Sequence, residues 1–208
     1  MATDSGLASG ELMDRFFAVR IEQSNEKLGA VQFPKLLLIE VEMGGTMTSY
    51  IFKAPDMTPL IIDISTLSQK AKHVMYGKDV DCIDGGDAAA DWISKYLGKR
   101  IRISVQPSGR DVYEHNPDFD RVNWRLGGIK NYKKLVNFSH HYPFNILGVD
   151  SVRQINEKIP GKSFTHRYFR TNMLVKALND NPWDEDNWTG ELHIGEAIFA
   201  VAAQSSRW

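Results

Sequence analysis

The stretch from residue 87 to residue 105 constrains the fold of this chain most, because its hydrophobic period changes there from that of a helix to that of a strand. One helical face is indicated by apolar side chains at Ala89, Trp92, Ile93, Tyr96 and Leu97. Asp87 can cap the start of this helix, and Gly98 can close its end. Residues 101–105 then alternate apolar and polar side chains, as a half-buried strand does. A helix joined so closely to a strand predicts an α/β fold class.

Short strand signals dominate the sequence before this helix. Strands are predicted at residues 16–21, 35–42, 49–53, 60–64 and 74–76. The pair Gly44 and Gly45 indicates the turn of a hairpin between the second and third of these strands. Residues 1–12 are typical of a flexible N-terminus. We therefore expect a β-rich N-terminal half over residues 13–85.

The second half, residues 86–208, adds one more helix and several strands. Residues 106–137 form a long polar loop, and a loop of this length in a compact domain is either disordered or functional. A helix is predicted at residues 151–159, with Ser151 and Gln154 as a capping box. Strands are predicted at residues 144–148, 169–175 and 193–203. The sum is a β-rich, mixed α/β protein with two short helices.

Charge and cysteine content exclude several classes of protein. The formal net charge of −1 gives no electrostatic reason to expect nucleic acid or an anionic membrane as a partner. Cys82 is the only cysteine, so an internal disulfide and a site of several thiolates are excluded. Asp81 and Asp84 should raise the pKa of this thiol and make it inert. The apolar runs are too short to cross a bilayer and no secretory signal precedes them, so we expect a cytoplasmic protein.

Most of the chain resembles the MOSC family. Residues 14–19 are similar to the Asp-Arg-x-Trp-x-Val strand of the family's N-terminal β-barrel domain, and residues 86–98 resemble the helix that joins its two halves. Residues 138–156 and 169–175 are similar to later segments, the second to a Phe-Arg-Pro-Asn strand. The family is named for the C-terminal domain of molybdenum cofactor sulfurase and includes the mitochondrial amidoxime-reducing component. The resemblance implies a MOSC-type β-barrel half followed by a MOSC-like domain.

The resemblance fails at the residue that carries the family's chemistry. The family has an Arg-Cys pair whose thiolate carries sulfur or ligates molybdenum, but here Arg207 is followed by Trp208, and an indole N–H only donates. Ser205 stands at the partner cysteine, and the family's Pro-x-Lys-Ser strand has no counterpart before Asp14. The resemblance thus implies a member truncated at both ends, naturally or through an incomplete gene model. We expect no cofactor and no metal; the alternative is residual molybdenum-cofactor binding through pterin and phosphate contacts.

A small set of polar residues forms the predicted site. Arg170 and Asn172 lie two apart on a predicted strand, so both would point to one face, which the resemblance turns toward the pocket. His140 replaces an aspartate of the family and can act as a general acid or base near neutral pH. We predict His140, Arg170 and Asn172 as catalytic residues. The predicted substrate-binding residues are His141, Tyr142, His166, Arg207 and Trp208.

Two functions of different classes stay open. The first is a cofactor-independent enzyme of small-molecule biosynthesis, in which His140 moves protons and Arg170 polarises a carbonyl or enolate during isomerisation, dehydration or cyclisation. Trp208 would fill the space of the cofactor and create an apolar cavity for the substrate. The second is a non-catalytic protein that binds a ligand or a partner. The sequence fixes neither the substrate nor the oligomeric state.

Overall fold

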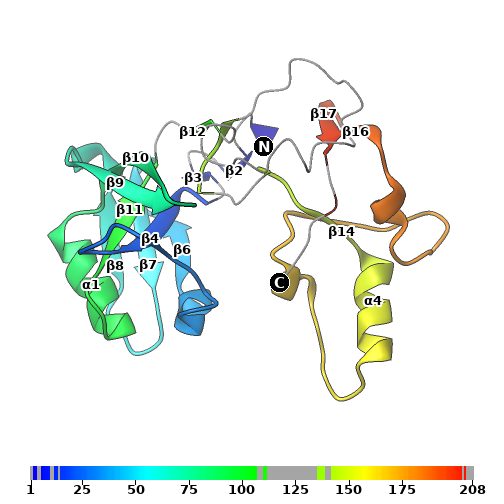
Figure 1. Cartoon of the computed structure of the whole chain (residues 1–208), viewed down its shortest axis with the longest axis horizontal. Coiled ribbons are helices and arrows are strands. Elements are labelled where there is room, and N and C mark those ends of the chain that lie inside the picture. The colour runs from blue at the N-terminus through cyan, green and yellow to red at the C-terminus, as the bar shows by residue number, and fades with distance from the viewer. Residues whose placement is uncertain are drawn as a thin grey trace.

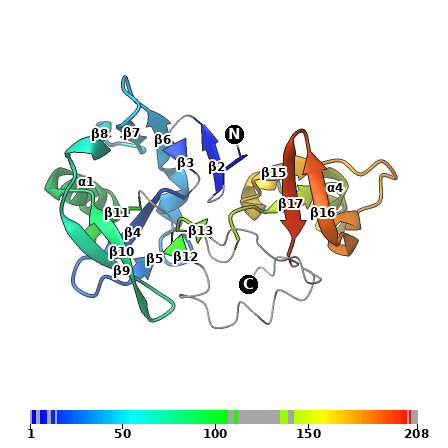
Figure 2. The ribbon, with the colours of Figure 1, turned by 90° about the horizontal axis from the view of Figure 1, so that it is seen from above.

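The computed structural model describes residues 2–3, 6–9, 12–13, 15–106, 110–111, 135–138, 142–202 and 204. Figures 1 and 2 show most of the described elements in two groups, which we call the N-terminal lobe (residues 15–106) and the C-terminal lobe (residues 142–202). Two short sheets lie outside both lobes. One consists of β1 (Ala2–Thr3), β2 (Gly6–Ser9) and β3 (Leu12–Met13), and the other of β12 (Arg110–Asp111) and β13 (Leu135–Val136). Strands outnumber helices in the described part, which confirms the predicted β-rich α/β class. Most of the predicted long loop lies outside the described residues.

A curled five-stranded antiparallel sheet forms the N-terminal lobe, in the order β5-β4-β11-β10-β9. Its strands are β4 (Phe17–Ile21), β5 (Lys27–Leu28), β9 (Lys70–Met75), β10 (Lys78–Asp84) and β11 (Ile101–Val105). The sheet curls until its edges meet, and the Val74 N–H donates to the Asn25 carbonyl at 2.8 Å. A parallel bridge between Glu26 and Val74 continues this contact. The predicted β-barrel half is therefore confirmed.

A second sheet of three strands lies beside the first, formed by β6 (Glu40–Met43), β7 (Ser49–Lys53) and β8 (Leu60–Asp63). The predicted hairpin at Gly44 is confirmed, since Met43 pairs with Tyr50 and the Gly44 N–H donates to the Ser49 carbonyl at 2.7 Å. The strand predicted at residues 35–42 is half wrong, because η1 (Pro34–Leu38) is a 3₁₀ helix. Pro34 has a fixed φ and no N–H, which suits the first turn of a helix and not a ladder.

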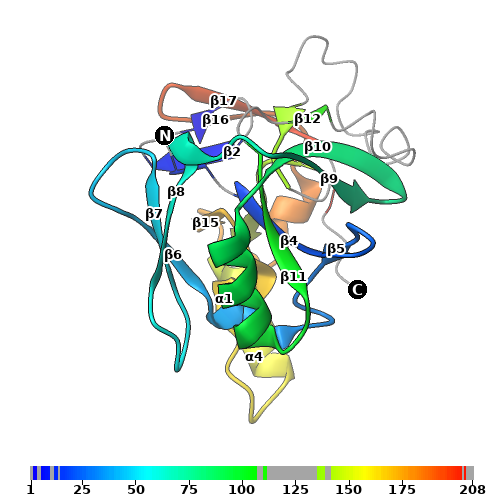
Figure 3. The same ribbon diagram turned by 90° about the vertical axis from the view of Figure 1, so that its left-hand side faces the viewer.

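The main core lies between the two sheets and helix α1 (Asp87–Leu97) (Figure 3). It includes Tyr50, Phe52, Ile62, Trp92, Ile93, Ile101, Ile103 and Val105. Gly98 closes α1 with φ 71°, as predicted, but Asp87 does not cap it: the cap residue is Gly86. The Asp87 carboxylate instead accepts a hydrogen bond from Arg102 Nη2 at 2.9 Å. The Asp87 side chain, which the helix pattern assigned to capping, thus pairs with Arg102 on the neighbouring strand β11.

The inner face of the curled sheet carries buried polar side chains beside a small apolar cluster around Val80, and the sequence pattern did not predict the polar ones. β11 was expected to be buried on one face only, yet Ser104 is fully buried on its second face because the sheet curls around it. The Ser104 hydroxyl lies 3.0 Å from His73 Nδ1, and His73 is also fully buried. Cys82 lies on this face, and burial raises the pKa of its thiol, with a contribution from Asp84. The predicted inertness of Cys82 agrees with this direction, although burial is the larger cause.

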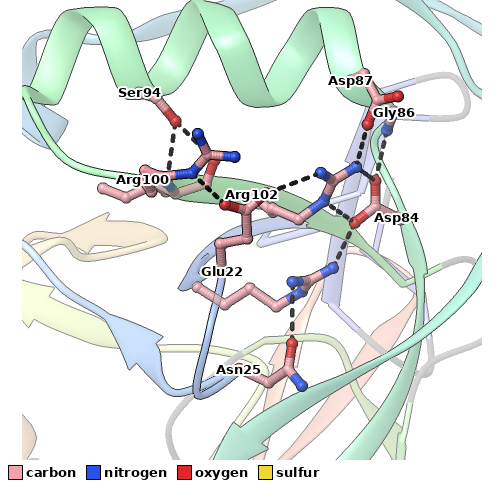
Figure 4. Close-up of polar contacts among 10 residues, drawn as sticks. Glu22, Asn25, Asp84, Gly86, Asp87, Ser94, Arg100 and Arg102 are labelled. Carbon is pink, nitrogen blue, oxygen red and sulfur yellow. Dashed lines mark hydrogen bonds and ion pairs between the residues drawn. The ribbon is translucent and has the colours of Figure 1, made fainter.

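Asp84 joins three parts of the N-terminal lobe through one carboxylate (Figure 4). It is 2% exposed and accepts hydrogen bonds from Arg20 Nη2 on β4, and from Arg102 Nε at 2.7 Å and Arg102 Nη2 at 2.6 Å on β11. The Gly86 N–H, at the start of α1, donates to it at 2.8 Å. Burial alone would raise the pKa of Asp84, but these hydrogen bonds and the two guanidinium charges outweigh burial and lower it.

The C-terminal lobe is built around a parallel strand–helix–strand unit. β14 (Ile146–Gly148) leads into α4 (Val149–Lys158), and β15 (Met173–Val175) then pairs in parallel with β14. Two 3₁₀ helices, η4 (His166–Phe169) and η5 (Asp184–Asn187), precede β15 and the final hairpin respectively. That hairpin consists of β16 (Gly190–Ile194) and β17 (Ala197–Val201). The single strand predicted at residues 193–203 is thus wrong, because Gly195, with φ 59°, turns the chain there.

Within the described residues, every helix is too short or too polar to cross a bilayer.

Replacing Asp84 by asparagine should destabilise the protein by about 3–5 kcal/mol, because the buried guanidinium of Arg20 and the half-buried one of Arg102 would lose their counter-charge. The measurement is urea unfolding of the variant and of the parent at neutral pH. Asp81→Asn is the matched control, since its side chain is 89% exposed and pairs with Lys72 on the surface. A small change in the control and an equally small change in Asp84→Asn would contradict the central role of Asp84.

The ion pairs of Asp84 should also make the stability of the protein depend on pH. Because the folded pKa of Asp84 lies below its unfolded value, its contribution is complete above the unfolded pKa and is lost as the pH falls through the folded pKa. Unfolding measured across the acidic range should therefore show a steeper loss of stability for the parent than for Asp84→Asn. Parallel pH profiles for the two proteins would be the contrary result.

Candidate functional site

The amino ends of β14 and β15 are held together by two asparagines that face each other. Asn145 N–H donates to Asn172 Oδ1 at 2.9 Å, while Asn172 N–H donates to the Asn145 carbonyl at 2.8 Å. Asn145 Nδ2 also donates to the Phe169 carbonyl at 3.2 Å. The Thr171 hydroxyl lies 2.8 Å from the same Asn145 carbonyl. These contacts fix the segment of residues 169–172 against the start of β14.

Arg170 is displayed at the surface of this fixed segment. It ends η4 in the left-handed conformation, with φ 51°, and its N–H donates to the Arg167 carbonyl at 3.1 Å. Its side chain is exposed, and no carboxylate among the described residues pairs with it. A guanidinium presented in this way is suited to bind phosphate or carboxylate.

The predicted geometry of Arg170 and Asn172 on one strand face is wrong. β15 begins at Met173, after both residues, because η4 continues to Phe169 and Arg170 turns the chain at its end. Asn172 directs its side-chain oxygen to the Asn145 N–H, so this oxygen holds the scaffold. The two side chains belong to one segment but have different tasks: Asn172 fixes the backbone, and Arg170 faces solvent.

The other predicted site residues are only partly described. His166 is exposed at the start of η4, four residues before Arg170, and Tyr142 is half-buried three residues before Asn145. His166, Arg170 and Tyr142 therefore lie in the two segments that the asparagine pair joins. Four further predicted residues lie outside the described part of the chain, namely His140, His141, Arg207 and Trp208. Their predicted roles stay predictions.

The carboxyl end of β14 forms a second polar arrangement, centred on Glu185. Its Oε1 accepts from the Gly148 N–H at 2.8 Å and from the Ser151 hydroxyl at 2.7 Å. The Ser151 Oγ in turn accepts from the Trp183 N–H at 2.7 Å. The predicted capping box is thus wrong: α4 starts at Val149, so Ser151 lies inside its first turn. The side chain of Gln154 accepts from the Trp183 indole.

Glu185 occupies the place where a helix N-terminus would bind an anion. Backbone N–H groups and the helix dipole favour negative charge there, and a carboxylate from η5 already supplies it. A Cβ added at Gly148 would lie 2.6 Å from Glu185 Oε2, so the carboxylate sits directly on the backbone. The start of α4 is therefore closed to an external anion. Of the two ends of this strand pair, the end with Arg170 is the open one.

A shallow hollow of about 340 Å³ lies in the N-terminal lobe and includes none of the predicted site residues. It is lined by Glu22, Asp87, Ala90, Asp91, Ser94, Arg100 and Arg102, and Figure 4 shows these residues except Ala90 and Asp91. Glu22 accepts from Arg100 Nε at 2.5 Å and from Arg102 Nη1 at 3.3 Å, and these two cations lower its pKa. Because its guanidinium groups already have carboxylate partners, this hollow serves the scaffold rather than a charged ligand.

Sequence reasoning missed Asn145 and Glu185, and it gave Ser151 a different hydrogen-bond partner. Asn145 was predicted to lie inside a strand at residues 144–148, but it directly precedes β14. Glu185 lies 34 positions from Ser151 in the chain, so no local pattern connects them.

Two family models match this chain. The MOSC N-terminal beta barrel domain matches residues 2–100, and the MOSC domain matches residues 133–207. The chain is 29% identical to human mitochondrial amidoxime-reducing component 1, across 99% of this chain and 57% of that protein. It is 26% identical to rat mitochondrial amidoxime reducing component 2, across 93% of this chain and 54% of that protein. The chain thus spans about half the length of these relatives.

A third relative is molybdenum cofactor sulfurase 2 of Culex quinquefasciatus, 23% identical across 93% of this chain and 25% of that protein. We expected this chain to have no cofactor. Its similarity to these relatives, one of which is named for the molybdenum cofactor, contradicts that expectation. That expectation rested on the missing cysteine at Trp208, on the missing Pro-x-Lys-Ser strand and on the change at His140. A large anionic cofactor also has phosphate and pterin groups that other residues can bind, so these departures did not justify excluding it.

Replacing Glu185 by alanine should destabilise the C-terminal lobe by about 1–2 kcal/mol, because the Gly148 N–H and the Ser151 hydroxyl lose their acceptor. Glu185→Gln keeps an acceptor and loses the charge, so it should cost less. Thermal unfolding of both variants measures the difference. Glu157→Ala, in the last turn of α4, is the control and should be as stable as the parent. Equal stability of all three variants would show that Glu185 does not hold the start of α4.

Proposed function

This chain belongs to the MOSC family, and from that membership we propose that it binds the molybdenum cofactor through the phosphate and pterin part of that group. The observation that carries the proposal is the match of family models to both halves of the chain, together with relatives named for molybdenum cofactor sulfuration and for amidoxime reduction. The proposal concerns binding; the activities in the relatives' names belong to longer proteins.

The described residues of the C-terminal lobe fit the anionic part of such a group. Arg170 offers an exposed guanidinium on a fixed segment, and a guanidinium fork matches the oxygens of a phosphate. Asn145 and Asn172 hold that segment, so little conformational freedom is lost when an anion binds. Because Glu185 closes the start of α4, it directs an anion toward Arg170 rather than to the helix terminus.

The metal end of the cofactor has no thiolate among the described residues of this lobe. Cys82 is the only cysteine of the sequence and lies buried on the inner face of the N-terminal sheet. When bound, the group would supply the sulfur or redox chemistry for which the relatives are named. Arg170 would bind and orient the phosphate, and the asparagine pair would keep Arg170 in place.

The more specific expectation of isomerisation, dehydration or cyclisation of an apolar substrate stays a prediction. Its proposed acid–base residue, His140, lies outside the described part of the chain, and the relatives reported above are not named for such reactions. A cytoplasmic location and a small-molecule ligand also stay predictions, and the amidoxime-reducing relatives are named as mitochondrial.

The test is to purify the protein from cells that make the cofactor and to measure its pterin by fluorescence of the released, oxidised form. We expect pterin in the parent and about tenfold or more reduced retention in Arg170→Ala, because a charge-assisted hydrogen bond to phosphate is lost. Arg167→Ala removes the same charge three residues earlier and is the matched control.

Parent protein without pterin would overturn the proposal and leave the two other functions, a cofactor-independent enzyme or a non-catalytic ligand or partner protein. Equal losses in Arg167→Ala and Arg170→Ala would show a diffuse electrostatic effect and remove the specific role of Arg170. Thermal unfolding of both variants separates loss of binding from loss of fold, since both side chains are exposed.

A further inference from the structure

A loop that we call the basic loop, residues 158–168, projects beyond the end of α4 (Figures 1 and 3). Asn156 closes the part at residues 157–163: its Oδ1 accepts from the Phe164 N–H at 2.6 Å, and its Nδ2 donates to the Phe164 carbonyl at 2.9 Å. Residues 157–163 are exposed along their whole length. The loop is therefore an ordered projection with a closed base.

The positively charged side chains of this loop form no ion pair with the described carboxylates. Lys158, Lys162 and Arg167 are exposed, and none of them pairs with a carboxylate in the described part of the chain. No aspartate or glutamate occurs between Lys158 and Asn179. Glu157, just before the loop, contacts Arg153 at 3.8 Å instead. The loop is thus a local cationic surface on a chain with a formal net charge of −1.

Apolar side chains lie among these cations and point into solvent. Ile159 is 42% exposed and is followed by Pro160 at the projecting end of the loop. Tyr168 is 59% exposed, and its ring packs edge-on against Phe164, with 5.5 Å between ring centroids. Tyrosine with a supported ring and an accessible hydroxyl is suited to the boundary between water and an apolar phase.

We propose that the basic loop docks on the surface of an anionic lipid bilayer. Lysine and arginine beside exposed aliphatic and aromatic side chains complement a layer of anionic headgroups above an apolar interior. A single phosphate ion would need convergent donors, whereas these cations are spread along a loop. The net charge of −1 gave no reason to expect an anionic membrane as a partner. The proposal revises that expectation, because residues 159–179 contain no aspartate or glutamate.

This docking surface goes beyond the proposed function and does not depend on it. Arg170, the residue assigned to the cofactor, is not part of the basic loop. A protein without pterin could still bind vesicles, and a protein with pterin could fail to bind them, so the two proposals fail separately. With three cations the attachment is weak and reversible, and it is expected to weaken with salt.

The experiment is co-sedimentation of the whole protein with vesicles of phosphatidylcholine alone or of phosphatidylcholine with phosphatidylserine. We expect binding to the anionic vesicles only, and its loss in high salt. The double variant Lys158→Glu/Lys162→Glu should bind about tenfold or more weakly, because two attractive charges become repulsive. The control Lys70→Glu/Lys95→Glu makes the same charge change at exposed positions of the N-terminal lobe and should bind like the parent.

A second pair of variants tests the apolar contribution. Ile159→Ser/Tyr168→Ser should weaken vesicle binding while its dependence on salt is kept. Three results would overturn the proposal: equal binding to neutral vesicles, no binding to anionic vesicles, or an equal loss in the control variant. The lipid and salt comparisons use the parent protein alone, so they decide the matter even if a loop variant folds poorly.

Discussion

One buried carboxylate shared by a buried and a half-buried guanidinium group is the constraint on which the N-terminal lobe depends. Arg20 and Asp84 are 3% and 2% exposed, and buried charges of this kind persist only when paired and hydrogen-bonded. The strands β4 and β11, which carry Arg20 and Arg102, must therefore lie next to each other on one side of β10, which carries Asp84, and the Gly86 N–H must begin α1 beside it. The curl of the sheet and the direction of the helix follow from satisfying this single group.

The elements with a clear hydrophobic period could be predicted from the sequence. α1 was predicted with its observed bounds, because its apolar face and its closing glycine leave little choice. The hairpin at Gly44 was also predictable, because its turn residues sit between two apolar runs. The prediction failed where tertiary contacts override local preference: Asp87 pairs with Arg102 instead of capping, and Ser104 is buried because the sheet curls.

The candidate site was less predictable, for a related reason. Arg170 was predicted as a catalytic residue on a strand face, whereas it is exposed at the end of η4, in a backbone geometry that no alternation reveals. The contact between Asn145 and Asn172, and that between Ser151 and Glu185, join residues distant in sequence through single hydrogen bonds. Such pairs produce no periodic pattern in the sequence from which they could be predicted. The expectation of no cofactor failed differently, because a few departures from the family's motifs were taken to exclude a group that other residues can also hold.

The contact between the two edges of the five-stranded sheet has a consequence for how copies of this chain meet. An open sheet presents unpaired N–H and carbonyl groups on its edge strands, and these recruit strands from other molecules. Here the Val74 N–H is already bonded to the Asn25 carbonyl, and the edge strand β5 is only two residues long. The curled sheet thus offers little template for strand addition, and its own main chain protects this sheet against edge-to-edge aggregation.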